Sequence, residues 1–178
     1  RARFFRTTDA GTEPLDASAA IAVGDRLFVE VEADEPVYAY VFNEDDQGRL
    51  YTLFPLASLE QRNPLPPGDR VRLPGTSGGR TKDWRVSSAG GREHFLAVLS
   101  RHPLPDLESA VARLEHAAPA PAPGAVSEGP TALRGVGELA DAPADADASG
   151  GHQLAALAER QRRRGALDVW WRTLVLRN

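Results

Sequence analysis

The sequence predicts a mainly β protein, an antiparallel β-sandwich or partly open barrel of the immunoglobulin-like or Greek-key type. Two observations carry this prediction. Short segments with alternating or continuous apolar residues follow one another between residues 27 and 100, and turn-forming Gly, Asn and Asp residues separate them. No helical periodicity occurs before residue 103, whereas a parallel sheet would need helices between its strands.

The first clear strand is predicted over residues 27–33, LFVEVEA. Leu27, Val29 and Val31 fall on one side of this segment, and two glutamates fall on the other. A period of two is typical of a strand with one buried face and one solvated face. The preceding Gly-Asp pair supplies a turn.

Three further segments, residues 37–42, 50–54 and 94–100, are apolar on both faces. This pattern predicts strands that lie centrally in a sheet, because both of their faces must be covered. Residues 70–73 and 84–88 alternate again, which predicts strands with one buried face.

The connections between these segments have the chemistry of turns. Residues 43–48, NEDDQG, are polar and end in Gly, which predicts a hairpin loop between two central strands. Residues 87–93 contain a Gly-Gly pair that tolerates positive φ and predicts a turn between two more strands.

Two helices are predicted after the strands. In residues 102–117 Asp106 can cap the first turn, and Leu107, Val111 and Leu114 form an apolar stripe. Residues 152–165 form the second helix, which ends at a glycine and carries four arginines in its last turns. We interpret this arginine run as the solvated end of a helix.

The chain is predicted to form a single β-rich domain over residues 1–178, with residues 118–151 as a flexible Ala/Pro/Gly-rich insert. Residues 131–139 within this insert are richer in apolar groups and are expected to pack against the sheet. Residues 166–178 alternate like a strand and contain two tryptophans that are costly to leave in water. We therefore expect this strand to return across the insert and to complete the sheet, with the two indoles on opposite faces.

Composition excludes several classes of function. The formal net charge of −4 argues against a nucleic-acid surface, because phosphate binding needs clustered positive charge. No apolar run approaches the ~20 residues of a transmembrane helix, so no spanning segment is predicted. The absence of Cys removes disulfides, thiolate nucleophiles and sulfur-ligated zinc. Because the chain starts at Arg1 and contains no Met, we expect it to be a piece of a longer polypeptide, and its compartment stays open between cytoplasm and envelope.

Residues 21–104 resemble a known family. The segments VGDRLFVEVEADEPVYAYVFNEDDQGRLYTLFP, NPLPPGDRVRLPG, Trp84 and GREHFLAVLSRHPL are similar, in this order, to the bacterial domain-of-unknown-function family 4384. The resemblance implies a β-rich accessory module, joined in larger bacterial proteins to partners such as caspase-like peptidases or serine/threonine kinases. It implies no catalytic residues.

Two motifs invite a chemical interpretation, and each is incomplete. Asn43, Asp45 and Gln47 copy the first half of a calcium loop, but Phe54 stands where the bidentate Glu is needed. Residues 75–82, GTSGGRTK, lack the Gly-Lys-Ser/Thr of a phosphate-binding loop, and a strand follows them in place of a helix. We predict no metal and no cofactor.

A catalytic site is likewise not predicted. Ser100 and His102 could share one face of a strand with Asp106 nearby, but Pro103 and Pro105 break that strand. No G-x-S-x-G elbow is present. Glu93 and His94 are neighbours on a strand and therefore point to opposite faces. A hydrolase with a site near Ser100 and His102, and an envelope-associated carbohydrate or lipid binder, remain as alternative hypotheses.

The segment 63–75, NPLPPGDRVRLPG, opens with three prolines that lack a backbone donor. Residues 63–67 must therefore lie at a sheet edge or outside a sheet, as a corner of the fold. Because a stiff loop loses little entropy when it binds, we predict a non-catalytic interaction or regulatory module that contacts another domain of the same polypeptide or a protein partner. The candidate contact residues are Phe54, Leu56, Asn63 and Leu65; the alternative is that such residues only close the sandwich.

Overall fold

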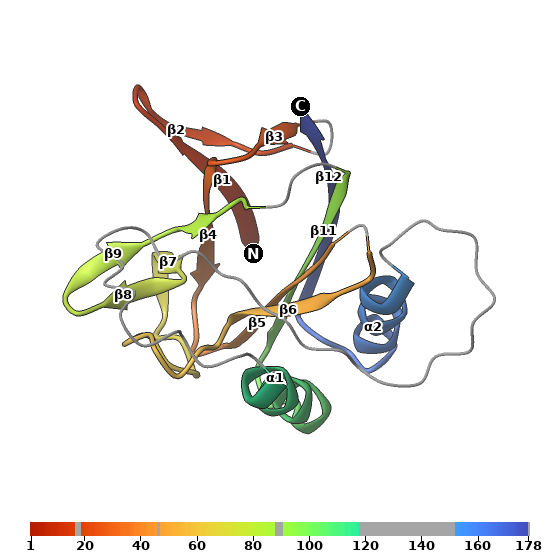
Figure 1. Ribbon diagram of the computed structural model, residues 1–178. Helices are drawn as coiled ribbons and strands as arrows, with labels where there is room; N and C mark the ends of the chain where they lie inside the picture. The colour runs from red at the N-terminus through yellow and green to blue at the C-terminus, as the bar shows by residue number, and fades with distance from the viewer. Residues whose placement is uncertain (17–18, 46, 88–90, 118–151, 178) are drawn as a thin grey trace.

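The computed structural model describes residues 1–16, 19–45, 47–87, 91–117 and 152–177 (Figure 1). Within these residues two five-stranded sheets face each other, and two helices cover one of them. The predicted mainly β, largely antiparallel sandwich is confirmed. The predicted insert, residues 118–151, lies outside the described residues.

The first sheet is antiparallel throughout. Strand β1 lies between β2 and β4, while β7 and β10 pair with the other edge of β4, one after the other along it. Its strands are β1 (Ala2–Thr8), β2 (Gly11–Pro14), β4 (Arg26–Ala33), β7 (Gly68–Leu73) and β10 (Trp84–Arg85).

The second sheet has the order β3-β12-β11-β5-β6. All its neighbours are antiparallel except β3 and β12, which run parallel. Its strands are β3 (Ala20–Ala22), β5 (Tyr38–Glu44), β6 (Leu50–Phe54), β11 (Arg92–Ser100) and β12 (Asp168–Arg177). A separate hairpin is formed by β8 (Gly75–Ser77) and β9 (Arg80–Lys82).

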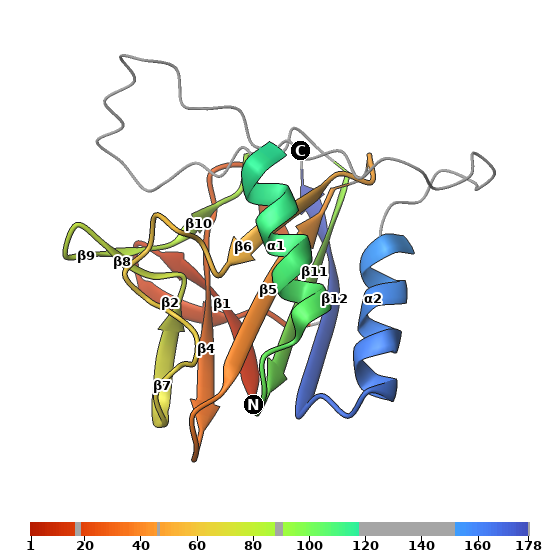
Figure 2. The ribbon, with the colours of Figure 1, turned by 90° about the horizontal axis from the view of Figure 1, so that it is seen from below.

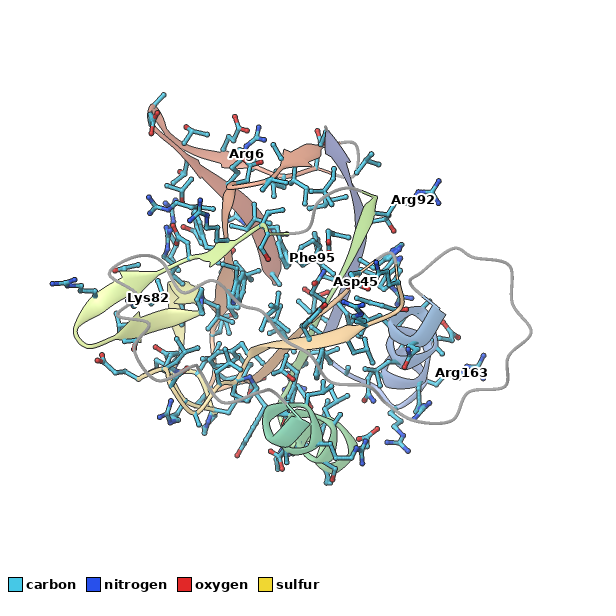
Figure 3. The ribbon with its side chains drawn as sticks, viewed as in Figure 1. Arg6, Asp45, Lys82, Arg92, Phe95 and Arg163 are labelled. Atoms are coloured by element: carbon cyan, nitrogen blue, oxygen red, sulfur yellow. The ribbon has the colours of Figure 1, made fainter. Side chains whose placement is uncertain are left out.

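The main core fills the space between the two sheets. Leu27, Val29 and Val31 of β4 are buried there, as the alternation in their segment predicted. The ring of Phe4 stacks on Trp170 at 4.1 Å between centroids and meets Phe95 edge-on at 5.5 Å. Figure 3 shows Phe95 in this position between the sheets. Contacts between these aromatic side chains help to join the two layers, because large aromatic rings bury much apolar surface.

The helices α1 (Pro105–Ala117) and α2 (His152–Arg163) cover the outer face of the second sheet (Figures 1 and 2). The stripe predicted for the first helix is buried against this face, and the second helix adds further apolar side chains. Strands β5 and β11 are therefore covered on both faces, which explains their continuous apolar sequence. This second core comprises Tyr40, Phe42, Leu50, Leu96, Val98, Leu107, Val111, Leu114, Leu154 and Ala158.

One strand position differs from the prediction. Residues 50–54 were expected in the middle of a sheet, but β6 is an edge strand. Both faces of β6 are nevertheless buried, because Leu50 packs in the helical core and Phe54 in the core between the sheets. In addition, the indole Nε1 of Trp84 donates to Leu53 O at 3.1 Å. A continuous apolar sequence thus indicates that both faces of a strand are covered, but it does not indicate whether the strand has a neighbour on one edge or on both.

The returning terminal strand is confirmed. β12 inserts between β3 and β11, and Trp170 and Trp171 lie on opposite faces of it, next to the two different cores. Residues 87–93 lead from β10 of the first sheet to β11 of the second, so they join the two layers; residues 88–90 are outside the described part.

The predicted hairpin loop at 43–48 has a second role, which is to hold the start of α2. The carboxylate of Glu44 is 1% exposed and accepts a hydrogen bond from the backbone N–H of Leu154 at 2.9 Å. The side chain of Gln153 donates to Gly48 O at 2.9 Å. A carboxylate at a helix N-terminus satisfies free N–H groups and complements the helix dipole.

Candidate interaction surface

The corner segment, residues 55–67, connects β6 of the second sheet to β7 of the first. It contains one isolated bridge, between Leu65 and Val37, the residue before β5. There, Leu65 N donates to Val37 O at 2.7 Å and Val37 N donates to Leu65 O at 3.1 Å. The prediction that the prolines lie outside a central ladder is confirmed.

Asn63 fixes this segment to strand β5. Its Oδ1 accepts a hydrogen bond from the backbone N–H of Ala39 at 3.0 Å, and its Nδ2 donates to the carbonyl of the same residue at 2.8 Å. One amide side chain therefore satisfies both backbone groups of Ala39, as a neighbouring strand would.

Arg62 orders the other half of the corner segment. Its guanidinium donates to four backbone carbonyl oxygens, which belong to Leu56, Ala57, Leu59 and Gln61. No neighbouring strand supplies N–H donors to these carbonyls. The guanidinium of Arg62 supplies them instead, because it carries several donors in a fixed geometry. The segment therefore has a defined backbone without regular secondary structure.

The four predicted contact residues have different surroundings. Phe54 and Leu65 are 0% exposed and belong to the core between the sheets, so their side chains close the sandwich, in agreement with the alternative interpretation. Leu56 and Asn63 are half-buried. Residues on the solvent side of the segment are exposed, and we call them the corner surface: Ala57, Ser58, Pro64, Pro66 and Pro67.

Glu60 joins the corner segment to the β8–β9 hairpin. Its carboxylate accepts hydrogen bonds from Thr76 Oγ1 at 2.6 Å and from Gly79 N at 2.8 Å. Gly78 and Gly79 form the turn with φ of 58° and 69°. The glycine-rich segment that invited comparison with a phosphate loop is thus a hairpin whose turn N–H binds a carboxylate of the same chain.

These hydrogen bonds predict a pH dependence of the hairpin contact. The Thr76 hydroxyl and then the Gly79 amide lower the pKa of Glu60 below its ordinary value of 4.5. A carboxyl with a lower pKa in the folded state stabilises that state above its unfolded pKa, and the contribution disappears as pH falls through the folded pKa. We expect the amide resonances of Thr76 and Gly79 to shift together in an acid titration followed by NMR.

The matched control for this titration is an exposed carboxylate elsewhere. Glu60→Gln should abolish the coupled acid shift of the two amides, whereas Glu35→Gln should leave it unchanged. A shift that persists in Glu60→Gln would contradict the assignment of the transition to Glu60.

Asn63→Ala is expected to lower the free energy of unfolding by about 2 kcal/mol, because it leaves both backbone groups of Ala39 without their partner. Urea unfolding measures this change. Gln47→Ala, which truncates an exposed amide side chain, should change the free energy by less than about 0.5 kcal/mol. Equal effects of the two substitutions would show that the Asn63 amide does not hold the corner.

The residues of the calcium-like loop have other partners. Asp45 Oδ1 accepts from the backbone N–H groups of Gln47 and Arg49, each at 2.9 Å, and closes the hairpin turn. Asn43 points to the neighbouring strand, where its Nδ2 donates to Glu93 Oε2 at 2.7 Å. Among the residues that the structure describes, no three His, Asp or Glu side chains are grouped as a metal site would require.

The serine, histidine and aspartate considered for a triad also make separate interactions. Ser100 Oγ accepts from the backbone N–H of His102 at 3.2 Å, and the side chain of His102 is exposed. Asp106 accepts from Gln161 Nε2 of α2 at 3.0 Å and from Nη1 of Arg164, the residue after α2, at 2.7 Å.

Glu93 and His94 are both buried and bind on opposite faces of β11, as predicted. Glu93 bonds with Asn43, while His94 Nδ1 lies 2.9 Å from Thr173 Oγ1 and its ring stacks on Trp171 at 5.6 Å.

The arginine-rich end of α2 is solvated, as interpreted from the sequence, and partly paired. Arg163 bonds with Glu159 at 3.0 Å and projects away from the sheet in Figure 3. Arg164 bonds with Asp106 and thereby links the two helices.

A polar network on the outer face of the first sheet was missed. Asp83 is buried, with its side chain 2% exposed, and its Oδ2 accepts from Arg26 Nε at 3.2 Å, Arg26 Nη2 at 2.9 Å and Thr7 Oγ1 at 3.0 Å. Arg72 donates to Oδ1, and its guanidinium lies 3.3 Å above the centre of the Phe28 ring. The sequence signal was the alternation of arginines in one-sided strands, which places them on a common face.

The architecture defines the class of this domain: a β-sandwich with a helical layer on one sheet. Residues 20–103 match the family described as Domain of unknown function (DUF4384), which confirms the resemblance seen in the sequence. The matched residues run from β3 to β11, whereas β1, β2, both helices and β12 lie outside them. No curated protein and no solved structure was found to match the chain. No helix in the described part is long and apolar enough to span a membrane.

Proposed function

We propose that this domain is a non-catalytic accessory module that binds another domain of the same polypeptide or a protein partner through the corner surface. A regulatory role beside a catalytic domain, such as a caspase-like peptidase or a serine/threonine kinase, agrees with what the family resemblance implies.

The observation that carries the proposal is that side chains of the corner segment itself fix its backbone. Arg62 binds four backbone carbonyls of this segment. Asn63 ties the segment to β5 by binding both backbone groups of Ala39. A contact loop that is already ordered avoids most of the ~0.5–1.5 kcal/mol per side chain that ordering on binding would consume. The prolines of the corner surface add apolar contact area with little rotational freedom.

The test uses substitutions at exposed positions, so that the fold is retained. The double variant Ala57→Asp/Pro66→Asp places two charges on the corner surface. The matched control, Pro103→Asp/Ala156→Asp, adds the same charges at exposed positions before α1 and on α2. Proteins bound by immobilised wild type and both variants are compared by quantitative mass spectrometry, and the selected partner is then purified for calorimetry.

We expect the corner variant to weaken binding of the purified partner by at least about tenfold, because two charges would be desolvated in an apolar contact. The control variant should bind like the wild type. Equal affinities of the corner variant and the wild type would exclude the corner surface as the contact.

A further inference from the structure

The outer face of the first sheet has a chemistry of its own. Both helices pack on the second sheet, so no described helix covers this face of the first. The strand register places Arg26 of β4 opposite Arg85 of β10, with Arg72 of β7 farther along β4. We call these three residues the arginine face.

The pairing of Arg26 with Arg85 is unfavourable in the isolated protein. Like charges directly opposite each other on antiparallel strands destabilise a sheet. Arg85 is exposed, and among the described residues no carboxylate lies within ion-pair distance of it. A fold that needed only stability would place an acidic or neutral residue at one of these two positions.

The buried carboxylate of Asp83 holds two of the three guanidinium groups in place. Arg26 uses Nε and Nη2 to bind Asp83, so that its Nη1 makes no described hydrogen bond. Arg72 is fixed from two sides, by Asp83 and by the ring of Phe28. Asp83 binds Arg26 and Arg72, and a second carboxylate, Glu30, lies directly opposite Arg72 in the strand register and also opposite Arg3. With Arg85 included, three guanidinium groups share this region with two carboxylates, so the group keeps a positive charge although the chain as a whole is negative. Glu32 lies farther along β4, where it pairs with Arg3.

We propose that the arginine face binds an extended acidic peptide segment of a protein partner. Guanidinium groups with fixed orientation bind carboxylates through paired N–H donors. A carboxylate between Arg26 and Arg85 would remove the like-charge repulsion between them. β7 is an edge strand beside this face, which allows an extended chain to lie along it. A peptide is favoured over nucleic acid because the backbone N–H and C=O groups of an extended chain can pair with the edge of β7, which a phosphodiester backbone cannot do.

The probe is a fluorescein-labelled deca-glutamate peptide, with deca-glutamine and a single-stranded DNA of equal length as comparisons. Fluorescence anisotropy at low ionic strength should give binding of deca-glutamate, weakening as salt is added, and no binding of deca-glutamine. Absence of deca-glutamate binding, or tighter binding of the DNA through the same arginines, would overturn the proposal.

The decisive variant is Arg26→Gln/Arg85→Gln, which we expect to bind deca-glutamate about tenfold more weakly than the wild type. Arg101→Gln/Arg163→Gln is the control; it removes the same charge from exposed arginines elsewhere. Equal losses in both variants would mean non-specific attraction and would overturn the proposal.

Three further measurements keep the outcome unambiguous. Arg85→Gln breaks no hydrogen bond or ion pair of the described structure and removes the repulsion from Arg26, so it should melt at or above the wild-type temperature and still weaken binding. Amide shifts on titration with deca-glutamate should fall on β4, β7 and β10. The corner variant Ala57→Asp/Pro66→Asp should bind the peptide like the wild type, so failure of the corner proposal and failure of this one are distinguished.

Discussion

A chain that ends at residue 165 is expected to lose its cooperative fold and to become insoluble or molten. The missing strand, β12, pairs with both β3 and β11 and contributes Trp170 and Leu174 to the core between the sheets. Each such side chain contributes roughly 2–5 kcal/mol, so the loss of these two alone is comparable with the roughly 5–15 kcal/mol by which domains are typically stable. Circular dichroism during heating and binding of a hydrophobic dye measure the loss.

Adding back the missing strand provides the control for this truncation. A synthetic peptide of residues 166–178 should restore a cooperative thermal transition to the truncated chain, whereas a peptide of the same composition in scrambled order should not. A sharp transition in the truncated chain alone would show that the second sheet is stable without β12.

Asp83→Ala is expected to lower the free energy of unfolding by about 3 kcal/mol. Removing one partner of a buried ion pair leaves the other charges uncompensated. The expected value lies at the lower end of the usual range, because the side chains of Arg26 and Arg72 are 51% and 30% exposed and water screens part of their charge. Urea unfolding followed by tryptophan fluorescence gives the measurement.

The comparison for Asp83→Ala is Glu35→Ala, which removes an exposed carboxylate that bonds with Arg101. This substitution should change the stability by less than about 1 kcal/mol. If both substitutions have equally small effects, the network around Asp83 does not contribute to folding, and its arginines are not held in place as argued above.

Local patterns predicted most of the strands but not their distribution between the sheets. The alternation in β4 and the continuous apolar sequence of β11 report which faces are covered, and both were correct. The edge position of β6 and the crossing of residues 87–93 between the layers depend on pairing partners far away in the sequence. The return of β12 was predictable because its two tryptophans require burial on both faces.

The candidate site was less predictable, because exposure in a corner depends on the packing of the whole fold. Phe54 and Leu65 are adjacent to prolines in the sequence and were predicted as contact residues, yet both are buried. Asp83 was missed because its partners come from three strands that are distant in the sequence. A single aspartate before a tryptophan carries no local signal of such a network.

The place of β12 between β3 and β11 has a consequence for synthesis in the cell. A ribosome releases β3 long before β12, and the parallel ladder of these two strands spans more than a hundred and fifty residues, from Ala20 to Val175. Until translation reaches β12, the edges of β3 and β11 that it joins have no partner for their backbone N–H and C=O groups, and such unpaired edges are prone to pair with other chains. The second sheet can therefore close only after residues 168–177 have been synthesised.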